Sequence, residues 1–144
     1  MQPTKTNPIL LDVITLFPEM FNALTGQGVV RRAFELGLVN LTLTNPREFA
    51  SNAYKTVDDR PYGGGPGMVM MVPPLAGAIR AARARHIALG YAPYVVYMSP
   101  QGERLTQVWV TTQLKAMRVS SDEATVAQNQ GLPRSLIVLC GRYE

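Results

Sequence analysis

Four short runs of apolar residues divide this chain at regular intervals. Residues 9–16 are mostly apolar, as expected of a strand that is covered on both faces. Residues 39–44 alternate between apolar and polar side chains, which is the period of a strand with one buried face. Residues 94–98 and 135–140 are again continuous apolar runs. The pattern therefore predicts four strands.

Stretches with helical spacing lie between these strands and are bounded by proline at their starts or glycine at their ends. We expect helices over 18–24, 29–36, 73–89 and 106–117. Arg80 and Arg83 lie on one face of the longest helix, and its apolar face carries Leu75, Ile79, Ala82, His86 and Leu89. Because His86 follows an arginine-rich run, we expect it on a solvated helix face rather than in a catalytic role.

The alternation of strands and helices predicts an α/β fold with a largely parallel sheet. In such sheets ligands bind beyond the carboxyl ends of the strands. Two predicted strands end in segments that suit a site, 99–102 and 141–143. Residues 45–68 and 118–134 are expected to be loops.

The first of these loops ends in the most distinctive run of the chain, residues 60–68. It holds four glycines and two prolines in nine positions, which excludes a helix or a central strand. Glycine lets another molecule approach the backbone closely, and proline stiffens its neighbours. The composition favours a braced binding loop over a flexible linker, with a tight structural turn as the alternative.

Composition narrows the class of protein. The chain of 144 residues is 47% hydrophobic, which suffices for one domain with a core, and no run approaches the roughly 20 apolar residues of a membrane span. The single cysteine excludes an internal disulfide and favours the cytoplasm, and residues 1–8 do not resemble a signal peptide. The net charge is +4 and 11 of the 14 basic residues are arginine, which is compatible with an RNA partner.

Common catalytic signatures are absent from the sequence. It has no phosphate-binding P-loop, no H-E-x-x-H and no C-x-x-C, and Ser99 has no histidine partner close to it in the chain. A site made of loops suits a cofactor that brings the reactive group. Tyr97, Ser99, Gly141 and Tyr143 could contact a flat heterocycle, although on its own Tyr97 reads as a core residue. Glu144 and Asp59 are the candidate carboxylates.

Four motifs occur in an order that resembles the bacterial tRNA (guanine-N1)-methyltransferases. They are Leu16-Phe-Pro-Glu-Met-Phe21, the run from Thr56 to Val72 around Arg60-Pro-Tyr-Gly-Gly-Gly-Pro-Gly-Met68, Tyr97-Met-Ser-Pro-Gln-Gly102 and Leu139-Cys-Gly-Arg-Tyr-Glu144. Together they cover most of the chain apart from its first residues and the 118–134 loop.

This resemblance implies a SPOUT-type domain, a parallel α/β fold with a deep trefoil knot, which acts as a homodimer. It implies S-adenosylmethionine as methyl donor and N1 of guanosine at tRNA position 37 as acceptor. The adenosine pocket would be lined by Tyr97, Met98, Ser99, Pro100, Gly141, Tyr143 and Glu144, which replaces the core interpretation of Tyr97. The target guanine would lie near Asp59, Arg60, Pro66 and Gly67.

Members of this family continue past the Gly-Arg-Tyr-Glu motif. The remainder carries the threaded part of the knot, an aspartate that acts as the base and a C-terminal tRNA-binding domain. We therefore expect residues 1–144 to be the N-terminal portion of the cofactor-binding domain, truncated before the knot is complete and inactive alone. The alternative is a non-catalytic RNA- or nucleotide-binding fragment. Magnesium dependence is a further expectation of the resemblance, although the sequence shows no ligand set for the ion.

Overall fold

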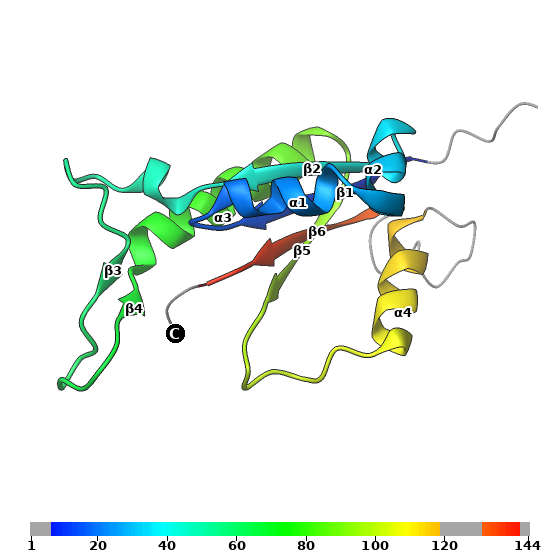
Figure 1. The fold of residues 1–144 in the computed structure, drawn as a ribbon. Coiled ribbons are helices and arrows are strands. Elements are labelled where there is room, and N and C mark those ends of the chain that lie inside the picture. Colours follow the sequence, from blue (N-terminus) through cyan, green and yellow to red (C-terminus); the bar gives the residue numbers. More distant parts are fainter. Residues whose placement is uncertain (1–6, 119–130, 142–144) are drawn as a thin grey trace, which may run out of the picture.

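A parallel sheet of four strands forms the centre of the molecule, which we describe from a computed structural model for residues 7–118 and 131–141. The strands lie in the order β2-β1-β6-β5, and all neighbours are parallel (Figure 1). Their bounds are β1 Ile9–Ile14, β2 Val39–Thr44, β5 Ala92–Tyr97 and β6 Arg134–Leu139. The four predicted strands and the parallel sheet are thus confirmed. Tyr143, Glu144 and most of the 118–134 loop lie outside the described residues.

Within residues 7–118 and 131–141, six helical segments connect or cover the strands. The first predicted helix is in fact a 3-10 turn followed by a single α-helical turn, whereas the other three are confirmed within one or two residues. The segments are η1 Pro18–Phe21, α1 Asn22–Thr25, α2 Gly28–Glu35, η2 Pro46–Phe49, α3 Val72–Ala88 and α4 Gln107–Met117.

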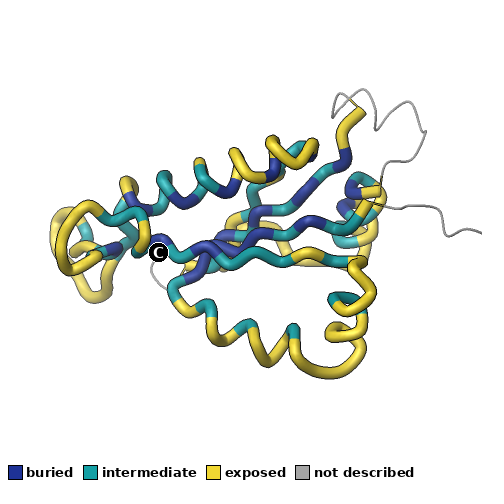
Figure 2. Tube along the Cα trace, turned by 90° about the horizontal axis from the view of Figure 1, so that it is seen from above, coloured by how far each residue is buried: buried dark blue, intermediate teal, exposed yellow. Residues whose placement is uncertain are grey.

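Helices α3 and α4 lie on opposite faces of the sheet. Ile137 and Leu139 of β6 pack with α3, whereas the alternate residues Leu136 and Val138 face a groove that α4 lines. Figure 2 shows α3 with its buried residues turned toward the strands. The arrangement is the layered one expected of an α/β domain.

The main core lies between α3 and the sheet. It consists of the buried residues Ile14, Ala78, Ala82, Ile137 and Leu139. Small alanine side chains on α3 let the helix backbone approach the strands closely. The predicted apolar face of this helix is confirmed except for Leu89, which is 63% exposed. Leu89 caps the helix, and the chain turns away at Gly90, whose φ is +82°, so it no longer follows the buried face.

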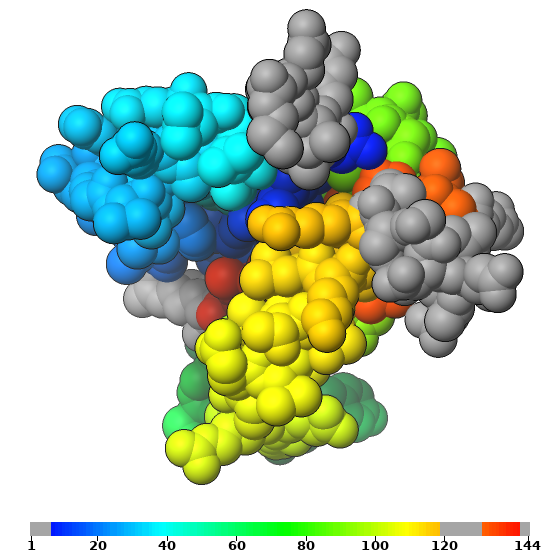
Figure 3. Space-filling model, turned by 90° about the vertical axis from the view of Figure 1, so that its right-hand side faces the viewer, coloured from blue at the N-terminus to red at the C-terminus, as the bar shows by residue number. Residues whose placement is uncertain are grey.

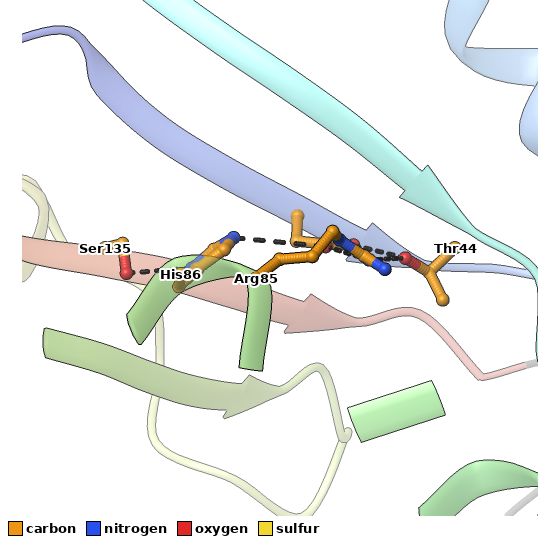
Figure 4. A network of polar contacts seen from close by, with 5 residues as sticks. Thr44, Arg85, His86 and Ser135 are labelled. Carbon is orange, nitrogen blue, oxygen red and sulfur yellow. Dashed lines mark hydrogen bonds and ion pairs between the residues drawn. The ribbon is translucent and has the colours of Figure 1, made fainter. Parts of the chain in front are cut away.

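His86 lies on the apolar face as expected, but the expectation that it is solvated was wrong, because this side chain is only 1% exposed. Its Nδ1 lies 2.8 Å from the Ser135 hydroxyl oxygen, and its Nε2 lies 3.9 Å from a carboxylate oxygen of Asp12 (Figure 4). Asp12 also accepts a hydrogen bond from Thr44 and an ion-paired one from Arg85. These five polar side chains connect α3 to three strands beneath it.

The expectation of a continuous loop over 45–68 was only partly correct. Besides η2, this region contains β3 (Asp58–Asp59), which pairs antiparallel with β4 (Val69–Met70). The glycine-rich run therefore forms the tip of a hairpin. Two-residue strands are too short to produce a readable alternation, so the sequence pattern missed them.

Candidate functional site at the carboxyl ends of the strands

The loops that follow β5 and β6 leave the sheet side by side. Tyr97 pairs with Leu139 at the ends of the two strands. The Met98 amide donates to the Leu139 carbonyl at 3.2 Å, and the Cys140 amide donates to the Ile14 carbonyl at 3.0 Å. Backbone hydrogen bonding thus continues past the strands and brings 97–99 beside 139–141, at the start of the two segments that the sequence singled out.

A tight turn follows β5. Its backbone is fastened at Ser99, whose carbonyl accepts from the Gly102 amide at 3.1 Å and whose hydroxyl accepts from the Gln101 amide at 3.2 Å. A Cβ on Gly102 would lie 3.2 Å from the Ser99 carbonyl oxygen, which accounts for glycine there. Pro100 is exposed on this turn. Ser99 therefore shapes the loop rather than acting as a nucleophile.

Tyr97 and Met98 are not core residues, because they are 45% and 51% exposed. With Ser99 they line one end of a groove of about 810 Å³ between the sheet and α4. The groove is lined mainly by apolar side chains of β5, β6 and α4. A flat heterocycle could lie on such a surface with its polar edge toward the loop backbone.

Gly141 faces a different groove, of about 560 Å³, beside η1 and α1. Phe17, Phe21, Leu24 and Cys140 are among the other residues that line it. Figure 3 shows atoms of the β6 end, in red, between the α1 segment and α4. Burial raises the pKa of the Cys140 thiol, so this thiol is protonated at neutral pH. The described cofactor candidates therefore share one edge of the sheet but line two grooves.

The hairpin that carries the substrate candidates is rooted at the same edge. Val57, Met70 and Met71 at its base line a small cavity together with Ile14 and Leu139 at the strand ends. The Met71 amide donates to the Val57 carbonyl at 2.8 Å, which closes the base of the hairpin. Its tip extends away from the sheet (Figure 1).

The four glycines of the tip all have positive φ, between +82° and +118°. Non-glycine residues rarely adopt such angles, so the backbone conformation itself requires glycine. A Cβ added to any of them would meet no atom within 4 Å, and Tyr62 beside them is fully exposed. The tip is therefore an open surface in a defined conformation.

Asp59, Arg60, Pro66 and Gly67 lie on this hairpin, and a carboxylate oxygen of Asp59 accepts from the Arg60 amide at 2.7 Å. None of the four lines the groove beside Tyr97. The structure thus places the described candidates on loops at one end of the sheet without joining cofactor and substrate candidates in one cavity.

Several residues of the groove were missed by the sequence reasoning. They include Leu105, which lies just before α4, and Trp109 and Gln113, which lie four positions apart on one face of α4. That spacing was readable in the sequence, but nothing indicated that the face would turn toward β5. Gln113 accepts from Arg134 at 2.8 Å, and Arg134 lies 4.9 Å above the Tyr94 ring, which anchors α4 to the sheet.

In the part of the chain that the structure describes, no three histidine, cysteine or acidic side chains gather as a metal site would require. The magnesium expectation therefore gains no support from these residues, and it stays a prediction of the resemblance.

Comparison with known proteins agrees with the motifs. Residues 9–144 match the family model described as tRNA (Guanine-1)-methyltransferase TrmD. The tRNA (guanine-N(1)-)-methyltransferase of Janthinobacterium sp. (strain Marseille) is 51% identical over 134 residues, which are 92% of this chain and 47% of that protein. The enzyme of the same name from Aromatoleum aromaticum is 52% identical over 92% of this chain and 44% of its own length.

The crystal structure of tRNA (m1G37) methyltransferase from Aquifex aeolicus superposes with a TM-score of 0.68 at 32% sequence identity. The match covers 96% of this chain and 53% of that one. The chain spans about half the length of the curated relatives it matches. Since the family model covers almost every residue, the chain belongs to the tRNA (guanine-1)-methyltransferase family.

Proposed function

We propose that the protein transfers the methyl group of S-adenosylmethionine to N1 of guanosine at position 37 of tRNA. Family membership supports this proposal, and so does the activity named for the similar Aquifex aeolicus enzyme. The observation that carries it is the hydrogen-bonded turn from Tyr97 to Gly102, which lines part of an apolar groove. Such a turn can position a cofactor without supplying a nucleophile of its own.

The described residues fit S-adenosylmethionine. Tyr97 and Met98 offer exposed apolar surface to an adenine ring, and the Ser99–Pro100 turn holds the backbone amides and carbonyls at its edge. Gly141, just after the neighbouring strand β6, adds a position without a side chain, and the resemblance assigns Tyr143 and Glu144 to the same pocket. The cofactor supplies an electrophilic methyl group on a sulfonium. The role of these residues is to orient it and to exclude water.

The exposed hairpin tip would receive the target guanosine. Pro66 and Gly67 present backbone with no bulky side chain to a planar base, and Arg60 and Asp59 lie at the foot of the tip. Guanine N1 carries a proton that must leave as the methyl group arrives, so the reaction needs a base. The resemblance places that base in a segment beyond these residues, and we propose accordingly that residues 1–144 alone do not turn over.

The remaining expectations stand as parts of the same proposal. They are a SPOUT-type knot completed by later residues, of which 1–144 form the N-terminal part, a separate C-terminal tRNA-binding domain, a homodimer, a cytoplasmic location and a magnesium requirement. In the described residues no helix has both the length and the apolarity that crossing a bilayer requires.

A direct assay tests the proposal. The gene product at its natural length is incubated with S-adenosylmethionine and two tRNA transcripts, one with guanosine and one with adenosine at position 37. Nuclease digestion and mass spectrometry should detect 1-methylguanosine from the first transcript only. Saturable binding of tRNA without any methylated nucleoside would instead favour the non-catalytic RNA-binding alternative.

A further inference from the structure

The segment between η2 and β3 is folded onto itself. The Lys55 amide donates to the Asn52 carbonyl at 3.1 Å, and the Thr56 amide donates to the Asn52 side-chain oxygen at 2.9 Å. Arg47 of η2 reaches across and donates to the Lys55 carbonyl at 3.1 Å. These bonds hold residues 52–56 in one conformation on the surface of the protein.

Lys55 adopts φ +50°, and it is the only non-glycine residue with positive φ in the described ranges. A residue with a Cβ is destabilised by about 1–2 kcal/mol in this left-handed backbone conformation, which glycine or asparagine adopts more easily. Loop geometry therefore gives no reason for a lysine here. Because Lys55 is exposed, its side chain is available to a partner outside the protein.

Tyr54, the residue before it, is 91% exposed. An exposed tyrosine ring next to an exposed lysine is a pairing that suits nucleic acid. Unpaired bases stack on aromatic rings, and phosphates attract lysine. The segment also lies at the same end of the molecule as the β3–β4 hairpin that it precedes, where Arg60 adds another exposed cation (Figure 1).

We infer that Tyr54 and Lys55 form a contact surface for unpaired nucleotides of the RNA substrate, with a base stacked on the Tyr54 ring and a neighbouring phosphate paired with Lys55. The inference rests on the proposed function, because it extends the RNA contact from the hairpin tip to the segment before β3. It assigns a substrate-positioning role to two residues that lie outside all four sequence motifs. Both come just before the motif that begins at Thr56.

Filter binding of a tRNA transcript to the full-length protein tests this directly, without requiring catalysis. Tyr54→Ala should weaken the affinity about 5- to 100-fold, whereas Tyr54→Phe should stay within about twofold of wild type because the ring remains. Lys55→Asn removes the charge from a position where asparagine tolerates positive φ. It should make the slope of log affinity against log salt shallower by about 0.7.

Lys115→Gln is the matched control, because Lys115 is an exposed lysine on α4, at the far end of the molecule from the hairpin. It should leave both affinity and salt slope unchanged. No variant should melt below the wild type, since all three substituted side chains are exposed, and Lys55→Asn should melt slightly higher because asparagine tolerates positive φ. If Tyr54→Ala proves to be misfolded, the salt slope of Lys55→Asn decides alone.

Unchanged affinity in Tyr54→Ala and an unchanged salt slope in Lys55→Asn would overturn the inference, as would a wild-type protein that does not bind tRNA. The inference would also be overturned if the variants changed the oligomeric state in sedimentation and left the RNA affinity unchanged. The surface would then be an interface between protein chains. A wild type that binds tRNA through Tyr54 but forms no 1-methylguanosine would support the inference while contradicting the proposed function.

Discussion

His86 illustrates how a single buried residue depends on its surroundings. Its Nδ1 lies 2.8 Å from the Ser135 oxygen, and its Nε2 faces the Asp12 carboxylate at 3.9 Å. A lone pair on Nε2 would be repelled by that carboxylate, so the geometry favours a proton on Nε2 and a hydrogen bond donated by Ser135. Burial lowers the pKa of His86, Asp12 opposes that effect and Arg85 adds to it.

The lowered pKa predicts a stability change in mild acid. The unfolded chain takes up a proton near its ordinary pKa of 6.5, whereas the folded protein does so only at lower pH. Stability should therefore fall as the pH drops below about 6.5 and level off below the folded-state pKa. Urea unfolding between pH 7.5 and 5 should show this slope in wild type.

His86→Asn is the matched variant, because asparagine can keep the bond to Ser135 but does not titrate. It should be less stable at pH 7.5 and should lack the part of the slope that wild type shows near pH 6. Equal slopes in the two proteins would mean that other groups cause the acid sensitivity.

Gly67 is the second residue whose role can be tested, with Gly63 as its matched control. Both lie on the exposed tip with positive φ, +91° and +84°, and alanine should strain each by a similar amount, about 1–2 kcal/mol. If the tip receives guanosine at Pro66 and Gly67, Gly67→Ala should lower kcat/KM for tRNA at least tenfold more than Gly63→Ala. Equal losses of activity and of melting temperature would favour a purely structural turn.

Among the elements, α3 and η2 meet where the helix has no side chain. A Cβ on Gly77 would lie 3.0 Å from the Cβ and 3.1 Å from the Cδ1 of Phe49. Gly77 thus allows η2 to pack closely on the helix. This contact supports the segment that leads into the hairpin, so element packing and site geometry are connected here.

Substitution of Gly77 should destabilise the protein even though alanine favours helix by about 1 kcal/mol, because overpacking costs about 1–3 kcal/mol. Gly90, which ends the same helix region, has φ +82° and open space around it. Gly90→Asn should therefore be tolerated better than Gly90→Ala, whereas Gly77→Asn should be worse than Gly77→Ala. Chemical denaturation of the four variants checks this, and the same order at both sites would contradict it.

At the scale of the whole molecule, the groove beside β5 joins an open, mainly apolar surface to the cofactor candidates Tyr97, Met98 and Ser99. Trp109, the only tryptophan of the chain, lines this groove together with Tyr97 and Met98. Its indole is therefore a built-in reporter of anything that binds there.

Titration of the full-length protein with S-adenosylmethionine should change the tryptophan emission saturably and raise the melting temperature, and Trp109→Phe should remove the emission change. At a cofactor concentration of about 100 times Kd, binding should raise the free energy of unfolding by about 2.7 kcal/mol. Tyr97→Ala should shift the titration midpoint upward, while Lys115→Gln should leave it in place. Saturable heat of binding in calorimetry with unchanged emission would place the cofactor away from this groove.

Much of this architecture was determined by the sequence itself. The four predicted segments became the four strands, because continuous apolar runs are typical of strands covered on both faces and the alternating run 39–44 is typical of a half-buried strand. The alternation with helices required a parallel sheet, and four glycines in nine residues required an irregular tip. The motifs around Tyr97 and Gly67 identified candidate residues because their order along the chain is specific to one family.

Other features were decided only by the tertiary structure. Backbone hydrogen bonds between strands do not depend on which side chains the strands carry. The position of β6 between β1 and β5 therefore could not be derived from the strand sequences alone. His86 is buried because Ser135, 49 residues later in the chain, lies opposite it. The α4 face with Trp109 lines the groove because strands β5 and β6, distant from it in sequence or later in the chain, pack opposite it. Such contacts join residues distant in sequence, and a local pattern records which face of an element is apolar but not which surface will cover it.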